Sequence, residues 1–90
     1  MMKKLPPPQT PLNQHSLASL EIWLADLGAR QSSTNCSIWI CSLPDWTTTI
    51  QMEEDELKVT WDKHGELSSC SFSYRLLRID VESVISQGPI

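Results

Sequence analysis

The sequence has little of what the common catalytic and membrane-bound classes require. Only 3 of its 90 residues are glycine, and none of them belongs to a phosphate-binding loop or a dinucleotide fingerprint. No apolar run approaches the roughly 20 residues that span a bilayer. The lysines near the start of the chain are not followed by the apolar segment of a secretory signal peptide. We therefore expect neither a membrane protein nor a nucleotide-dependent enzyme.

Histidine is scarce as well, because the chain contains only two, His15 and His64. His15 precedes an expected helix, where it can cap the helix or hydrogen-bond the preceding segment. His64 lies beside Gly65 in an expected turn. Neither belongs to a Ser/His/Asp arrangement or to another nucleophile with an adjacent base. The sequence thus predicts a protein that is not an enzyme and that has no cofactor.

Basic residues are outnumbered, with 7 lysines and arginines against 11 aspartates and glutamates and a net charge of −4. A body of this sign repels phosphate backbones, so we expect no nucleic acid partner. The order of elements derived below is similar to that of a double-stranded-RNA-binding domain. That domain needs basic residues at the start of its last helix, whereas here Asp80 and Glu82 follow Arg78.

The three cysteines cannot all pair within one chain. Cys36 and Cys41 have opposite parity on an expected strand, which argues against a shared zinc site. The acidic run Glu53–Glu56 lacks the sharp glycine turn of a calcium loop. We expect no metal site and three reduced thiols in the core, as is usual in a reducing compartment such as the cytosol.

Tryptophan is the residue type that the chain has in excess, with four in 90 residues. Each can bury roughly 150–250 Å², so together they compensate for the small core of a short chain. Chain length and a hydrophobic content of 40% predict one globular domain. Pro6, Pro7, Pro8 and Pro11 favour an extended path at the start of the chain. We expect residues 1–15 to form a proline-rich arm, of which residues 1–9 add little stability, and residues 16–90 to form the domain.

Four short apolar-rich runs predict strands over residues 36–43, 46–52, 56–61 and 67–74. In the last three runs apolar and polar side chains alternate, which is the period of a half-buried strand. The first run is apolar on both faces, because Ile38 and Ile40 point one way while Trp39 and Cys41 point the other. Such a strand is either covered twice or carries an exposed apolar patch.

Two helices flank these strands. The first runs from Ser16, a good N-cap, to Leu27 and ends at Gly28, while Ile22 falls off its apolar stripe. The members of that stripe are Leu17, Leu20, Trp23, Leu24 and Leu27. The second helix runs from about Arg78 to Gln87, with Leu77, Val81, Val84 and Ile85 on its apolar side. The predicted fold is α+β with the order α-β-β-β-β-α: a four-stranded antiparallel meander with both helices on one face.

Four segments of the chain carry recognisable motifs. They are the helix Leu20-Glu21-x-Trp23-Leu24-x-x-Leu27-Gly28, the turn Pro44-Asp45-Trp46, the segment Phe72-x-Tyr74-x-Leu76-x-Arg78-x-Asp80-Val81-Glu82 ending in Gly88-Pro89, and the upstream Thr10-Pro11-Leu12-Asn13-x-His15. These motifs are similar to those of a small domain-of-unknown-function family found in cyanobacteria and plastids. The resemblance covers residues 10–89. It implies a setting, the cyanobacterial cytosol or the plastid stroma, and no activity. The family pattern has a serine cap where this chain has Leu77.

These observations favour a non-catalytic interaction protein, an accessory or assembly factor that binds a protein partner or a second copy of itself. The candidate surface comprises Ile22, Ile38, Trp39, Ile40 and the acidic residues Glu53, Glu54 and Asp55. The alternative is a small-molecule carrier with tryptophans lining a pocket between sheet and helices.

Overall fold

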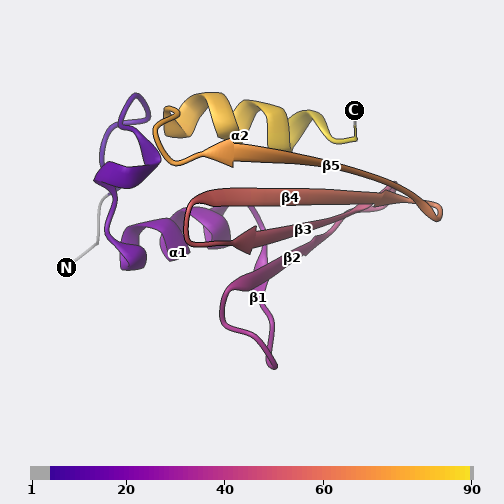
Figure 1. The fold of residues 1–90 in the computed structure, drawn as a ribbon. Coiled ribbons are helices and arrows are strands. Elements are labelled where there is room, and N and C mark those ends of the chain that lie inside the picture. Colours follow the sequence, from indigo (N-terminus) through magenta and orange to yellow (C-terminus); the bar gives the residue numbers. More distant parts are fainter. Residues whose placement is uncertain (1–4, 90) are drawn as a thin grey trace.

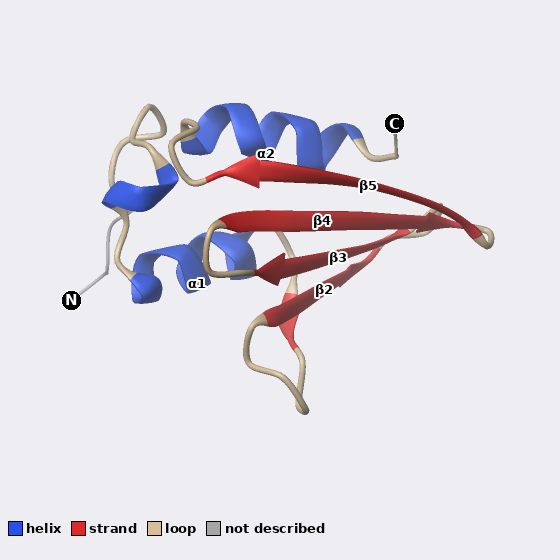
Figure 2. Cartoon of the chain, viewed as in Figure 1, coloured by secondary structure: helices blue, strands red, loops and turns tan. Residues whose placement is uncertain are grey.

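The computed structural model describes residues 5–89, which form two helices and an antiparallel sheet of five strands (Figures 1 and 2). The elements are the 3-10 turn η1 (Leu12–Gln14), helix α1 (Leu17–Asp26), strands β1 (Arg30–Gln31), β2 (Ile38–Ser42), β3 (Thr47–Met52), β4 (Glu56–Lys63) and β5 (Glu66–Ser73), and helix α2 (Arg78–Gln87). The α+β class is confirmed. Within the described residues, no helix has the length and apolar character needed to cross a membrane.

The sheet has five strands where the sequence predicts four. Its order is β1-β2-β3-β4-β5, with every neighbouring pair antiparallel. The additional strand, β1, pairs Arg30 with Ile40 and Gln31 with Trp39. Two polar residues cannot show an alternating pattern, so the sequence gives no signal for this strand. β1 shields part of the outer edge of β2.

Helix α1 forms as its caps predict. The Ser16 hydroxyl accepts a hydrogen bond from the backbone N–H of Ser19 at 3.1 Å, and Gly28 has a φ of 92° just after the helix. Trp23 and Leu24 are buried on the side that faces the sheet. Leu17, expected on that apolar stripe, is instead 62% exposed at the first turn.

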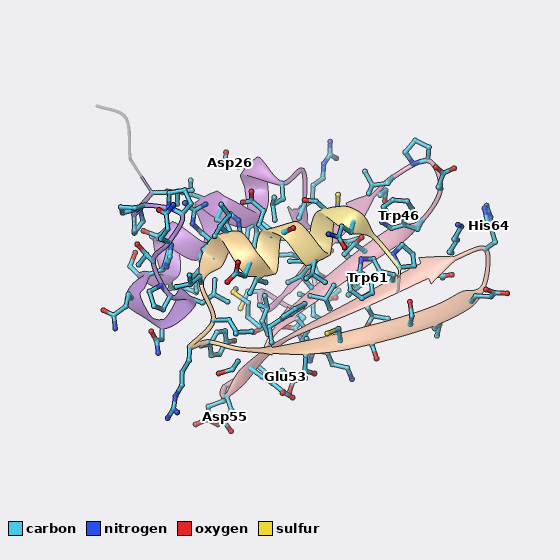
Figure 3. All side chains as sticks on the ribbon, turned by 90° about the horizontal axis from the view of Figure 1, so that it is seen from above. Asp26, Trp46, Glu53, Asp55, Trp61 and His64 are labelled. Atoms are coloured by element: carbon cyan, nitrogen blue, oxygen red, sulfur yellow. The ribbon has the colours of Figure 1, made fainter. Side chains whose placement is uncertain are left out.

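The core lies between the two helices and one face of the sheet (Figure 3). Along each strand the buried side chains alternate with more exposed ones, so the buried ones all lie on one face of the sheet. Both helices pack on this face, as predicted. The buried core residues are Leu12, Trp23, Leu24, Ala29, Trp39, Cys41, Ile50, Leu57, Val59, Trp61, Phe72, Val81 and Ile85. Three of the four tryptophans are therefore core residues, and the half-buried Trp46 packs against the edge of this cluster.

The N-terminal arm docks on the start of α2. Thr10 O accepts from Arg78 N at 3.0 Å, and Pro8 O accepts from Ile79 N at 2.9 Å. Helix α2 has Leu77 at its N-cap and no side-chain cap hydrogen bond. The arm's carbonyl groups thus bind N–H groups that would otherwise lack a partner at a helix start.

Two side-chain contacts add to this docking. Arg78, which is buried, donates from Nη2 to Pro6 O at 3.0 Å, and the half-buried Leu5 packs against the core. Leu12, at the end of the arm, is 1% exposed. For residues 5–9, the part that the structure describes, these contacts favour a contribution to stability, in contrast to the expectation that residues 1–9 add little.

Candidate interaction surface

The side of the sheet opposite the core is left uncovered by both helices. We call it the open face and define it by the side chains of Ile38, Ile40, Ser42, Thr47, Thr49, Gln51, Lys58, Thr60, Asp62, Leu67, Ser69 and Ser71. The strand register sets four of these side by side across the sheet, in the order Ile40, Thr49, Thr60 and Ser69. Six of these twelve side chains carry a hydroxyl group and three more are polar or charged, so the apolar residues are a minority on this face.

Ile38 and Ile40 form the apolar part of the open face at its β1–β2 end. Ile40 is 39% exposed, although a residue of its type is usually buried, and Ile38 is half-buried beside it on β2. The structure thus resolves the two-faced character of this strand, because one side of β2 enters the core and the other lies open. Leu67, at the opposite edge of the same face, is 71% exposed.

Arg30 adds a positive charge next to Ile40. Its partner in the register is Ile40 itself, and a hollow of about 310 Å³ is lined by Gly28, Arg30, Ile40 and Ser42. Within residues 5–89, Arg30 forms no ion pair. The sequence alone did not single out Arg30, because a strand of two polar residues has no recognisable pattern; its pairing with β2 reveals its position.

Two of the residues expected on the interaction surface lie elsewhere. Trp39 is 7% exposed and belongs to the core, so it cannot contribute to a surface contact without unfolding. Ile22 is half-buried on α1, and α1 packs on the core side of the sheet. The structure therefore keeps Ile38 and Ile40 together and separates them from Ile22.

The acidic hairpin tip, formed by Glu53, Glu54 and Asp55, is exposed between β3 and β4 (Figure 3). It lies beyond the end of β2 that carries Ile38, because Ile38 pairs with Gln51 two residues before the tip. The Tyr74 hydroxyl donates a hydrogen bond to the carbonyl oxygen of Glu53. Burial first, and then the carboxylates of Glu53, Asp55 and Glu56, raises the pKa of Tyr74 above its ordinary value.

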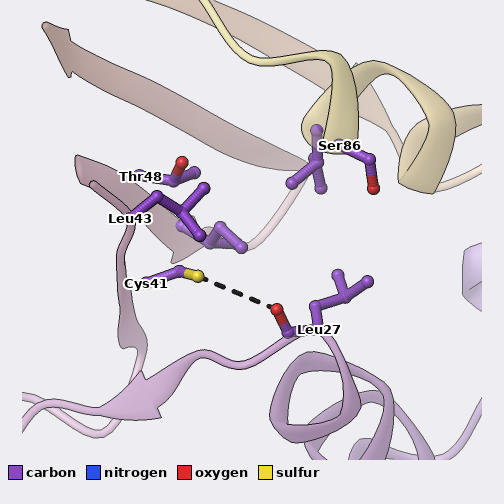
Figure 4. Close-up of a pocket in the computed structure, with 7 residues that line it drawn as sticks. Leu27, Cys41, Leu43, Thr48 and Ser86 are labelled. Atoms are coloured by element: carbon purple, nitrogen blue, oxygen red, sulfur yellow. Dashed lines mark hydrogen bonds between the residues drawn. The ribbon is translucent and has the colours of Figure 1, made fainter. Parts of the chain in front are cut away.

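A cavity of about 220 Å³ lies between the sheet and the C-terminal ends of the two helices (Figure 4). It is lined by Leu27, Cys41, Leu43, Thr48, Ile50, Ile85 and Ser86. The Cys41 thiol donates to Leu27 O at 3.7 Å on one side of it. None of the four tryptophans lines this cavity. Trp23, Trp39 and Trp61 belong to the core, and Trp46 lines a separate hollow beside the turns that carry Pro44 and His64.

The histidines and cysteines lie in separate places. His15 Nδ1 donates to Pro11 O at 3.0 Å, which matches the predicted hydrogen bond with the arm. His64 occupies the turn between β4 and β5 with a φ of 55°. Cys41 is buried and Cys70 is half-buried, but Cys36 is exposed, so the expectation of three core thiols is wrong for Cys36. Within residues 5–89 no three potential metal ligands form a cluster.

Comparison with known proteins identifies a family. The model of the family described as "Protein of unknown function (DUF3143)" matches residues 27–88, more than half of the chain. The chain belongs to the DUF3143 family. No curated protein and no solved structure matches it.

The family match covers the sheet and the second helix but not the first. It contains all five strands and the whole of α2, whereas α1 ends at Asp26, just before the match begins. The resemblance inferred from the sequence is thus confirmed as one to a family of unknown function over residues 27–88. The part of the chain that carries Arg30, Ile38 and Ile40 is family sequence, and the arm lies outside the match.

Proposed function

We propose that this DUF3143 chain is a non-catalytic protein-interaction module, an accessory or assembly factor, that binds a protein partner through the β1–β2 end of its open face. One observation carries the proposal. Ile40 is exposed and Ile38 is half-buried on the face of the sheet that neither helix covers. Apolar residues grouped on an otherwise polar surface often mark a binding site. The setting that we propose, the cyanobacterial cytosol or the plastid stroma, rests on the sequence resemblance.

The surroundings of Ile40 suggest the chemistry of the partner. Arg30 lies beside it over a polar hollow, and the acidic tip lies beyond Ile38. A partner segment with an apolar side chain next to a carboxylate matches Ile40 and Arg30. An arginine suits this role because its planar guanidinium binds a carboxylate through two hydrogen bonds. The acidic tip disfavours a second negative charge at the other end, which fixes the direction of the segment.

The test uses variants on the open face of two neighbouring strands, β2 and β3. Ile38→Ser with Ile40→Ser removes the apolar part of the open face, and Thr49→Ser, beside Ile40 in the register, is the matched control. We expect the double variant to remain folded and to lose capture of its partner in a pull-down from a cyanobacterial or chloroplast lysate. The control should capture as well as the unchanged protein does.

A third variant calibrates the first two. Trp39→Ser acts on the core side of the same strand and should lose about 3–5 kcal/mol of stability, as large core truncations do. If the double isoleucine variant captures the same partner as the unchanged protein, the open face is not the binding site. If it unfolds as Trp39→Ser does, Ile38 and Ile40 are structural.

A carrier function is the second candidate, because a cavity lies beside Cys41 and Thr48. Its small size argues against this function. Its 220 Å³ falls below the roughly 300–1,000 Å³ of ordinary ligand pockets. No tryptophan borders it, so indole fluorescence is a poor reporter of binding there. Alkylation of Cys41 is the better one: a bound metabolite should slow it, and an unchanged rate across a metabolite screen argues against a carrier.

A further inference from the structure

Strand β5 is an edge strand of unusual length for so small a sheet. It has 8 residues and pairs only with β4. The other edge, β1, has 2 residues and includes the charged Arg30. An edge strand presents unpaired backbone N–H and C=O groups that can pair with another chain. The two edges of this sheet therefore differ strongly in what they can bind.

The register shows which groups on β5 point outward. Lys63 and Glu66 flank the two-residue turn at His64 and Gly65 and form a hydrogen-bonded pair, as such turns require. Hydrogen-bonded and non-hydrogen-bonded pairs alternate along an antiparallel ladder. The backbone groups of Leu67, Ser69 and Ser71 consequently point away from β4, and within residues 5–89 they have no other backbone partner. These three residues form the open edge.

The edge is covered just beyond this point. Tyr74 O accepts from Asn13 N at 2.8 Å, and Leu76 O accepts from Leu12 N at 3.0 Å. The arm thus occupies the continuation of the edge and leaves only the open edge unpaired. A strand that docks there must be short and must end before Tyr74.

The open edge lacks the residues that usually protect an edge. From Leu67 to Tyr74 there is no charged residue and no proline, although charged side chains and prolines are the common means of preventing strand pairing. The chain as a whole carries a net charge of −4, so two copies repel one another over most of their surface. Along Leu67–Tyr74 they can approach without a like charge on either strand.

We propose that β5 pairs with β5 of a second copy in an antiparallel, two-fold symmetric contact centred on Ser69. In this arrangement Ser69 faces the partner's Ser69, and Leu67 faces the partner's Ser71. The three open-edge residues are evenly spaced about the centre, so each of their backbone groups finds a partner. The result is a continuous sheet of ten strands. A two-fold contact closes on itself and stops at the dimer.

This contact uses a different surface from that of the proposed function and goes beyond it. It rests mainly on backbone hydrogen bonds over a short segment, so its area lies below the roughly 1,200 Å² of stable interfaces. The dimer is therefore weak and concentration-dependent. It leaves the open face of each copy uncovered on the same side of the extended sheet.

The test places a charge at the centre of the contact. Ser69→Lys sets two ammonium groups against each other across the axis, on a side chain that is exposed in the single copy. Thr60→Lys is the matched control, because Thr60 is the neighbour of Ser69 on β4 and adds the same charge to the same face one strand further in. We expect sedimentation up to about 1 mM to show dimers for the unchanged protein and the control, and monomers for Ser69→Lys.

Amide hydrogen exchange supplies the second measurement. The N–H groups of Leu67, Ser69 and Ser71 should exchange slowly at high concentration and fast at low concentration, with no such change in Ser69→Lys. Ser71→Lys, which faces the partner's Leu67, replaces Ser69→Lys if the latter does not fold. A protein that stays monomeric with fast exchange at these three amides, or a dimer that survives both lysine variants, overturns the proposal.

Discussion

Among the three glycines, which all lie within the described residues, only Gly88 has both a backbone conformation and surroundings that exclude a side chain. Its φ is 90° and its ψ is −158°, a region that residues with a Cβ rarely occupy. A Cβ built there would lie 2.5 Å from Cζ2 of Trp46. The turn after α2 and the packing of Trp46 therefore depend on the same glycine.

Replacing Gly88 should lower the free energy of unfolding. We expect Gly88→Ala to lose about 3 kcal/mol, because backbone strain of this kind costs of order 1–3 kcal/mol and the Trp46 ring must also move. Gly65→Ala is the control, since Gly65 also has a φ of 90° but nothing within 4 Å of its Cβ position. Urea unfolding of both variants measures the difference; equal losses would show that the Trp46 contact is unimportant.

Tyr74 gives the protein a predictable response to alkaline pH. Its pKa is raised by burial and by the carboxylates of the acidic tip, so the folded state holds the phenolic proton more firmly than the unfolded state does. The stabilisation is complete below the unfolded pKa of about 10 and is lost as pH rises through the folded pKa.

The measurement uses the fact that the chain has a single tyrosine. Absorbance titration of tyrosinate should give a higher pKa in the folded protein than in concentrated urea. The unfolding free energy should fall above pH 10 more steeply than in Tyr74→Phe, which keeps every other titrating group. Identical titration curves in the folded and unfolded states would contradict this prediction.

At the scale of elements, strong local sequence signals were sufficient to predict the helices and most of the strands. Features that depend on contacts between distant segments could not be predicted. Both helices end where Gly28 and Gly88 predict, and the alternating runs became β3, β4 and β5. The strand β1 could not be predicted, because Arg30 and Gln31 become a strand only by pairing with β2. The exposure of Ile40 and the burial of Trp39 likewise required the structure, because a strand that is apolar on both faces does not indicate which face is buried.

The arm shows the same limitation most clearly. A proline-rich segment has no hydrophobic period to place it, yet its carbonyl groups bind the first N–H groups of α2. The sequence does show that α2 lacks a capping side chain, because Leu77 occupies its N-cap position. The partner that replaces the cap comes from about seventy residues away along the chain, and no local pattern reveals it.

Deleting residues 1–9 should therefore destabilise the protein. The loss of the acceptors Pro6 O and Pro8 O and of the packing of Leu5 is expected to cost about 2 kcal/mol, at roughly 1 kcal/mol for each hydrogen bond.

Leu77→Ser tests the mechanism, because a serine cap is worth about 1 kcal/mol. This substitution should be more favourable in the truncated chain than in the full chain. Urea unfolding of the four proteins measures the coupling; a coupling of zero would show that the arm does not act as a cap.

At the scale of the whole molecule, the position of the second copy determines the shape of the dimer. The Cα radius of gyration of the described chain is 12.7 Å. Pairing of β5 with β5 separates the two β3 strands, which lie near the middle of each sheet, by five strand spacings, or about 24 Å. The dimer is therefore long, with a radius of gyration of about 17–18 Å on the same strand spacing.

Small-angle scattering of the full chain distinguishes this shape from its alternatives. We expect the radius of gyration to rise with concentration toward the value for the dimer, because the edge contact is weak. Ser69→Lys should hold it near the monomer value at every concentration. Ile38→Ser with Ile40→Ser should leave the rise unchanged, since the open face lies on the side of the sheet and not at its edge. If the isoleucine variant abolishes the rise and Ser69→Lys does not, the two copies meet through their open faces, and the site proposed for a partner is the dimer interface instead.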